Sequence, residues 1–170
     1  MTAFQKFCAL DANGVAFAVR WNSASPTSAP VKLAPLPGLL GLGADVSTVA
    51  GAYNQFGYIA GQSVSGNGSS TAVLWSPGGG TAIQVSARGD NCAAVDVVDT
   101  VAVDQPAVLL NCPSGTGTVT PKLATPTGLL GSYVTATLAK NGASTYCVAA
   151  AINTALQVLG SCVLPAAPFT

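Results

Sequence analysis

The chain contains no histidine, and charged side chains make up only 7% of its 170 residues. A typical soluble domain is about 25% charged. Histidine is the residue that enzymes use most often for general acid and base catalysis, so its absence excludes a serine hydrolase with a histidine base. Six Lys and Arg residues balance six acidic ones, which leaves no basic stripe for nucleic acid and no polybasic patch for lipid.

Long apolar runs are also missing. The mean hydropathy is +0.50, yet Gly, Ser, Thr, Asn and Pro interrupt every run well before the roughly 18 residues that span a bilayer. No sustained 3.6-residue stripe predicts a helix, and we expect many short strands without membrane insertion. A surface with so little charge has little self-repulsion, so we expect protein partners or self-association.

The five cysteines are an odd number, and no two of them have Cys-x-x-Cys spacing. With no histidine, this pattern does not indicate a zinc site. Two disulfides and one free thiol would fit an oxidising compartment, and buried free cysteines would fit equally well. The sequence leaves the pairing open among Cys8, Cys92, Cys112, Cys147 and Cys162.

The first eight residues show no signal-peptide pattern. We therefore expect one of three histories: a signal peptide has been removed, the protein leaves the cell by another route such as lysis with a virus particle, or it stays inside.

Turn-like segments recur along the chain at nearly constant spacing. Gly57 follows Gly14 by 43 residues, Asp99 follows Gly57 by 42, and Gly142 follows Asp99 by 43. Asp or Asn at the first turn position can bond its own backbone, and Gly at the last position supplies a positive φ, so each turn can close a hairpin. Regular spacing over the whole length indicates a repeat architecture. The predicted turns are 11–14, 54–57, 96–99 and 139–142.

Each turn is followed by apolar runs of strand length. The clearest copy has strands predicted at 58–64, 72–75 and 82–85, after a first strand that ends at the turn. In the other copies the second strands are predicted at 15–18, 101–104 and 145–148, the third at 18–21, 107–110 and 156–159, and the fourth at 31–34, 121–124 and 162–164.

A four-stranded unit of about 43 residues has the size of a propeller blade. We therefore predict an all-β fold, a single domain over residues 1–170 built as a four-bladed β-propeller of repeats at 5–44, 45–89, 90–131 and 132–170. A β-trefoil, a β-sandwich and half of a larger ring closed by a second chain are the alternatives. Small side chains are expected near the axis (Ala9, Ala52, Ala94 and Ala136), and large ones between the blades (Trp21, Trp75, Leu110 and Leu159).

Residues 52–85 carry two adjoining motifs. Residues 53–54 and 57–61 approximate an Ile-Asn-Asn-x-Gly-Gln-Val-Val-Gly core, and 72–75 approximate a His-Ala-Phe-Leu-Trp strand, while 36–38 match part of a Leu-Gly-x-Leu-x-Gly turn. The copy resembles the HAF-type repeat of bacterial extracellular proteins. Tyr58 stands where that family has Gln, and Thr71 stands where it has its namesake His. The resemblance implies a propeller-like fold in a surface or secreted setting and brings no catalytic residues.

All six acidic residues are aspartates: Asp11, Asp45, Asp90, Asp96, Asp99 and Asp104. Three of them lie in the repeat turns, where a structural role accounts for them. Nothing marks a pair of carboxylates in which one has a raised pKa, as glycoside hydrolysis requires. Asp96, Asp99 and Asp104 are close enough in sequence for weak calcium binding, but their spacing matches no calcium loop. We predict no catalytic, cofactor-binding or metal site.

Other candidate motifs are short. Arg88-Gly89-Asp90 is a tripeptide that some adhesion receptors bind, Asn67-Gly68-Ser69 matches a glycosylation acceptor, and Gly78–Gly80 lacks the lysine and helix of a phosphate loop. Aromatic side chains can stack on sugars, although repeat-equivalent positions favour packing between blades. These aromatic residues are Trp21, Trp75, Tyr53, Tyr58, Tyr133 and Tyr146.

These features predict a non-enzymatic structural or adhesive protein of an extracellular, cell-surface or virion-surface assembly. The alternative is a lectin-like propeller module that binds a ligand, such as a carbohydrate, through the loops at one face. We expect no enzymatic activity, because neither a general base nor a nucleophile with its partner is evident.

Overall fold

The computed structural model describes residues 8–10, 13–22, 24–38, 43–100, 105–115, 117–128, 131–140, 142, 144 and 146–164. These residues form antiparallel strands and no helix, which confirms the all-β prediction. Sheet 1 contains β1 (Cys8–Leu10), β2 (Ala16–Arg20) and β3 (Val31–Lys32). Sheet 2 contains β4 (Ser47–Tyr53), β5 (Ile59–Val64), β6 (Ser70–Trp75) and β7 (Ile83–Gln84). Sheet 3 contains β8 (Ala93–Val98), β9 (Ala107–Ser114), β10 (Thr118–Pro126) and β11 (Tyr133–Thr137), and sheet 4 contains β12 (Tyr146–Ile152) and β13 (Val158–Val163).

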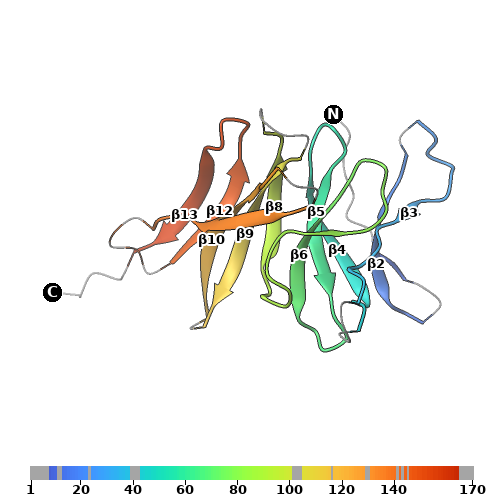
Figure 1. Ribbon diagram of the computed structural model, residues 1–170, viewed down its shortest axis with the longest axis horizontal. Helices are drawn as coiled ribbons and strands as arrows, with labels where there is room; N and C mark the ends of the chain where they lie inside the picture. The colour runs from blue at the N-terminus through green and yellow to red at the C-terminus, as the bar shows by residue number, and fades with distance from the viewer. Residues whose placement is uncertain are drawn as a thin grey trace.

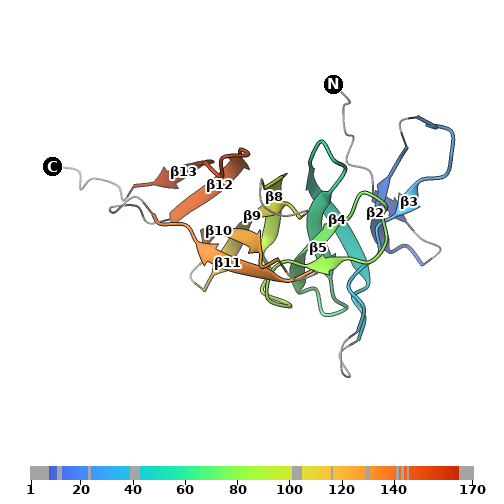
Figure 2. The ribbon, with the colours of Figure 1, turned by 45° about the horizontal axis from the view of Figure 1, so that its top comes forward.

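The four sheets follow one another in chain order, each formed by strands that are consecutive in sequence. Figure 1 shows them in a row with β3 and β13 at opposite ends, and Figure 2 shows the same order. Neighbouring sheets touch through β2 and β4, β4 and β8, and β8 and β12. Within the described part of the chain the sheets form no closed barrel or propeller, so the predicted ring is not seen.

Two apolar cores hold the row together. Ile59, Val73 and Trp75 of sheet 2 pack with Ala18 and Leu33 on the side of sheet 1. On its other face, sheet 2 packs Ala60, Ala72 and Leu74 against residues of sheet 3, among them Ala94, Val108 and Leu110. Successive side chains of a strand point to opposite faces of the sheet. In β5, therefore, Ile59 faces the preceding sheet and Ala60 faces the following one.

A β-bulge at the same place in three sheets makes their positions directly comparable. The pairing register shifts between Ala50 and Ala52 in β4, between Ala94 and Asp96 in β8, and between Ala149 and Ala151 in β12. The residues that pair with Ala52, Asp96 and Ala151 are Ala60, Leu109 and Leu159. These three are therefore equivalent positions on the face that looks toward the next sheet.

The clearest predicted copy is correct, since β5, β6 and β7 lie at 59–64, 70–75 and 83–84. In the first copy, the predicted strands at 15–18 and 18–21 form one strand, β2, and 31–34 contains β3, which is the third strand of its sheet. In the third copy, the turn predicted at 96–99 begins inside β8, and the strand predicted at 101–104 lies outside the described residues. The segments 107–110 and 121–124 fall in the second and third strands of sheet 3, not in the third and fourth.

The fourth predicted copy is out of register. Its expected start, near residue 132, falls at β11, which pairs with β10 and belongs to sheet 3. Residue 145 lies outside the described residues, and 146–148 begin β12, the first strand of sheet 4. The segments 156–159 and 162–164 overlap the second strand, β13. The hairpin of sheet 4 turns at Asn153, not at 139–142. Asn153 accepts bonds from the backbone N–H groups of Ala155, Leu156 and Gln157.

That hairpin repeats the chemistry of Asn54, whose backbone carbonyl accepts from Gly57 N and whose side chain accepts from Tyr58 N. Leu156 has a φ of 60° where Gly57 has 86°. Only a few per cent of non-glycine residues adopt a positive φ. Because this position holds Leu and not Gly, the sequence carries no glycine signal for the turn.

Some of the residues expected in the core are buried and others are exposed, depending on where their sheet lies in the row. Trp75 and Leu110 are fully buried, as predicted. Leu159 is 69% exposed because sheet 4 is an end sheet with a neighbour on one side only, and Trp21, which follows the last residue of β2, is 43% exposed. Ala136 is also exposed, on β11, and was wrongly expected near an axis.

Candidate functional site

In sheets 2 and 3, a polar side chain on the second strand links the sheet to the one that follows. Gln62 Nε2 donates to the carbonyl of Cys92 at 3.3 Å. At the equivalent position in sheet 3, Asn111 Nδ2 donates to the Ala149 carbonyl and Asn111 Oδ1 accepts from the Ala149 N–H, both at 2.9 Å. The corresponding residue of sheet 4 is Ser161, which is exposed. The position that binds the following sheet in sheets 2 and 3 therefore lies open in sheet 4.

Replacing Asn111 with Ala is expected to loosen sheet 4 from sheet 3. The substitution leaves the buried N–H and carbonyl of Ala149 unpaired, which costs about 1–3 kcal/mol of folding free energy. Urea denaturation gives the loss, and hydrogen exchange should show it concentrated in β12. Asn111→Asp keeps the acceptor for the Ala149 N–H but sets a carboxylate oxygen against the Ala149 carbonyl, so it should cost at least as much as Asn111→Ala. Unchanged exchange in β12 would contradict this role.

The aspartates near the predicted turns join sheets. Asp99 Oδ1 accepts from Asn54 Nδ2 at 2.6 Å, and Asp96 Oδ2 accepts from the N–H of Ile152 at 2.8 Å. Burial raises the pKa of Asp99, and a hydrogen bond with its own backbone opposes that rise. Asp11 and Asp104 lie outside the described residues. The carboxylate oxygens of Asp96 and Asp99 thus serve as acceptors for protein donors in neighbouring sheets.

Arg88 and Asp90 of the tripeptide are both engaged inside the protein. Arg88 donates to the Pro37 carbonyl at 2.9 Å and the Gly43 carbonyl at 3.3 Å, and it forms a 2.9 Å ion pair with Asp45. The Asp45 side chain is only 1% exposed. A receptor would have to break these contacts to reach the guanidinium, so the geometry gives no support to tripeptide recognition.

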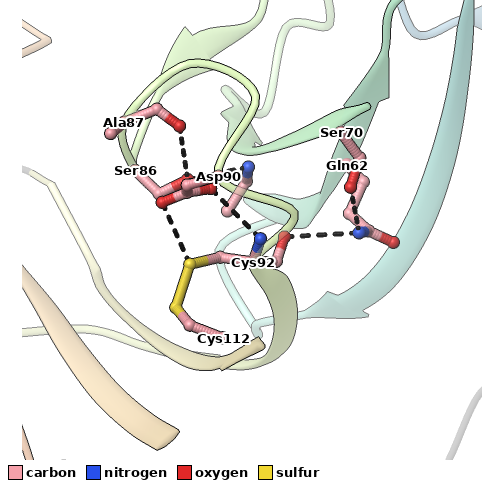
Figure 3. Close-up of a disulfide and its surroundings, with 8 residues drawn as sticks. Gln62, Ser70, Ser86, Ala87, Asp90, Cys92 and Cys112 are labelled. Atoms are coloured by element: carbon pink, nitrogen blue, oxygen red, sulfur yellow. Dashed lines mark hydrogen bonds between the residues drawn. A yellow bond between two sulfur atoms is a disulfide. The ribbon is translucent and has the colours of Figure 1, made fainter. Parts of the chain in front are cut away.

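Asp90 lies beside a disulfide between Cys92 and Cys112 (Figure 3). Its Oδ1 accepts from Ser86 Oγ at 2.8 Å and from the N–H of Cys92 at 3.1 Å. Its Oδ2 lies 3.0 Å from Cys92 Sγ, but a disulfide sulfur carries no proton and offers no thiolate. Although Asp90, Cys92 and Cys112 lie close together, the group is a structural cross-link and does not supply the thiolate ligands of a metal site.

A second disulfide, between Cys147 and Cys162, joins the strands of sheet 4. Both cross-links occupy the place where Thr48 and Ser63 pair in sheet 2. Closing a loop of 15 to 20 residues stabilises a protein by about 3 kcal/mol in the chain-entropy model. Two disulfides are compatible with an oxidising extracellular environment. Among the described residues, no helix is long and apolar enough to span a membrane.

The aromatic residues differ in their exposure. Trp75 is fully buried and its Nε1 donates to the Ala34 carbonyl at 2.8 Å. Tyr133 donates its hydroxyl to the Pro106 carbonyl at 2.9 Å, and burial raises the pKa of Tyr133 above its usual range, with a smaller contribution from Tyr58. These two serve packing. Tyr53 is 43% exposed and Phe56 is 62% exposed, on the β4–β5 hairpin.

The outward face of sheet 4 is the surface that remains open at the end of the row. We name it the sheet-4 surface and define it by Tyr146, Val148, Leu159, Ser161 and Val163, which share one face by their pairing. Sequence reasoning missed it because Leu159 was expected between blades. Ala60 and Leu109, which occupy the position of Leu159 in sheets 2 and 3, are both 0% exposed. The sheet-4 surface carries no charged side chain.

Two of the hollows formed by the described residues lie beside these sheets. One, of about 490 Å³, lies beside sheet 4 and is lined by Pro121, Leu138, Val148, Leu156 and others. The other, of about 380 Å³, lies between residues of sheets 2 and 3, including Ser86 and Tyr133. No charged side chain lines either hollow. Comparison of the chain with known protein families, with curated proteins and with solved structures found no match.

Proposed function

We propose that this chain is a non-enzymatic structural or adhesive protein of an extracellular or virion-surface assembly, and that it contacts its protein partner through the sheet-4 surface. One observation carries the proposal: Leu159 is 69% exposed at a position whose equivalents in sheets 2 and 3 are fully buried beneath neighbouring chain. Repeat proteins normally end in a unit with a polar outer face. An aliphatic, uncharged end face is typical of a contact surface.

The polar chemistry supports a scaffold. The side chains of Asp45, Asp90, Asp96 and Asp99 each accept hydrogen bonds from other residues of the protein. The chain has no histidine. Sheets 2 and 3 have four strands each, the size of a propeller blade, and we propose that the sheets stack as propeller-like units without requiring the chain to close a ring by itself.

Two further features support a place outside the cell. The two disulfides fit an oxidising compartment. The resemblance of residues 52–85 to the HAF-type extracellular repeat points the same way.

Fractionation of the native source tests this proposal. An epitope-tagged wild-type chain is expected in the cell-surface or particle fraction, whereas Leu159→Lys should remain in the soluble fraction, because a charge on the contact surface resists desolvation. The side chain is 69% exposed, so the variant should keep the wild-type melting temperature. Recovery of both chains from the cytosol would rule the proposal out.

A lectin-like module remains the second candidate function, on the strength of Tyr53 and Phe56. These aromatic residues are 43% and 62% exposed on one hairpin, and exposed rings can stack on sugars. A glycan array should then show a ligand whose binding weakens in Phe56→Ala. An array without signal would leave the structural role alone.

A further inference from the structure

Sheet 4 is smaller than its neighbours. It has two strands, whereas sheets 2 and 3 have four each. A two-stranded hairpin is marginally stable by itself, and three or more strands give independent stability. In sheets 2 and 3 the second strands, β5 and β9, pair with a third strand on their far side. No described strand occupies that side of β13.

β13 has none of the devices that usually protect a sheet edge. Edge strands in monomeric proteins are shortened, bulged, or marked with charge or proline. The last strands of sheets 1 and 2 are two residues long, and β3 contains Lys32. β11 is longer, but its first residue, Tyr133, packs against the core between sheets 2 and 3. β13 has six residues, no charge and no proline, and the bulge of sheet 4 lies on β12.

We infer that the protein partner is a second copy of this chain. In the dimer, β13 pairs antiparallel with β13 of the partner subunit about a two-fold axis. The result is a continuous four-stranded sheet in the order β12, β13, β13 of the partner and β12 of the partner, the size of sheets 2 and 3. An isologous contact of this kind uses the same residues on both copies and closes after two subunits. The inference rests on the proposed function, since it names a partner for the edge strand β13, which carries Leu159, Ser161 and Val163 of the sheet-4 surface.

The alternation of side chains limits the register. Residues directly opposite each other in an antiparallel pair share one face of the sheet. A two-fold axis at Ser161 therefore places Leu159 opposite Val163 of the partner subunit. Leu159 and Val163 are 69% and 45% exposed, and this register brings them together on the sheet-4 surface. It also leaves the disulfide between Cys147 and Cys162 on the opposite face.

The opposite end of the row argues against a head-to-tail polymer. The face of β2 that points away from sheet 2 carries Phe17 and Val19, because Ala18 lies in the core with sheet 2. Phe17 and Val19 are 7% and 8% exposed, so the part of this face that lies on β2 offers sheet 4 little apolar surface, and the exposed apolar side chain there is Trp21, which follows β2 and is 43% exposed. Contact between two identical β13 strands requires no such receiving face.

The contact is small, so the dimer should be weak. Six residues of β13 span about 20 Å, and interfaces well below about 1,200 Å² are typical of transient complexes. We expect a dissociation constant between about 1 μM and about 1 mM. An assembly that displays many copies would still hold together, because linked weak contacts reinforce one another.

Sedimentation velocity with hydrogen exchange tests the pairing. The full chain carrying Cys8→Ser, which excludes dimers linked through that thiol, is measured from about 10 μM to about 1 mM. We expect a monomer–dimer equilibrium. Amide exchange within Val158–Cys162 should slow as concentration rises, because edge pairing supplies hydrogen-bond acceptors and face-to-face stacking does not.

Leu159→Lys should weaken the dimer at least tenfold with an unchanged melting temperature. Val134→Lys is the matched control, because Val134 is 55% exposed on β11, and it should leave the dimer intact. A monomer at every concentration, open-ended polymers, a dimer without slowed exchange in β13, or equal weakening by both variants would each overturn the inference. A monomer that still fractionates with the cell surface or particles would remove the self-pairing alone, whereas a cytosolic dimer would remove the proposed function alone.

Discussion

Arg88→Met is expected to lower the free energy of unfolding by about 3 kcal/mol. The substitution removes the cation that pairs with Asp45 at 2.9 Å, and the Asp45 side chain is 1% exposed. Removing one partner of a buried ion pair costs about 3–5 kcal/mol, because the other charge stays buried without compensation. The Arg88 side chain is 21% exposed, so solvent screening places the effect at the lower end.

The same guanidinium also holds the segment that connects sheets 1 and 2, through the carbonyls of Pro37 and Gly43. Urea denaturation at pH 7 measures the loss. Arg20→Met is the matched control, because Arg20 donates to the Pro77 carbonyl at an exposed site, and it should cost less than about 1 kcal/mol. Adding Asp45→Asn to Arg88→Met should recover part of the loss. If the double variant is no more stable than the single one, the buried charge is not the cause.

The sequence was most informative where local chemistry and tertiary structure agree. Asn54 and Gly57 carry the turn signal, and the structure uses them as expected, with an Asn54 side-chain bond to the Tyr58 N–H and a φ of 86° at Gly57. Alternating short apolar runs separated by Gly and Ser specify strands without reference to any partner. The all-β class and the strands of sheet 2 could therefore be predicted from residue types alone.

The register of sheet 4 could not be predicted, because its turn requires a positive φ at a residue that is not glycine. Leu156 adopts a φ of 60°, which is unusual for a side chain with a Cβ. A second signal was present: Ala151-Ile152-Asn153 repeats the spacing of Ala52-Tyr53-Asn54. Weighting Asn above Gly would have placed the hairpin correctly.

The candidate site depends on which sheets lie beside a strand, and the sequence of the strand alone does not determine this. Leu159 has the same neighbours in sequence whether or not another sheet covers it. Its burial is decided by the number of sheets in the row and by their order. The sequence could exclude histidine-based chemistry, but only the equivalence of Ala60, Leu109 and Leu159 shows that one member of the set is exposed.

Gly51→Ala is expected to separate sheets 2 and 3. A Cβ at this position would lie 2.3 Å from the carbonyl oxygen of Ala94 and 3.4 Å from that of Ala60. The closer atom belongs to the backbone of β8, so relief requires a shift of one sheet against the other. Overpacking typically costs about 1–3 kcal/mol and occasionally more. We expect about 3 kcal/mol for Ala and a larger loss for Val.

Chemical denaturation measures this loss, and hydrogen exchange in β8 shows whether it arises where β4 approaches sheet 3. Gly66→Ala is the control, since its Cβ would meet only Val46 Cγ1 at 3.9 Å, an ordinary contact. Equal stability of the two variants would show that β4 and β8 do not lie in such close contact. Gly51 is the extra residue of the bulge in β4, and it forms no part of the turn signals in the sequence. If the prediction holds, glycine is required there by the approach of two sheets, and the row of sheets that exposes Leu159 depends on that approach.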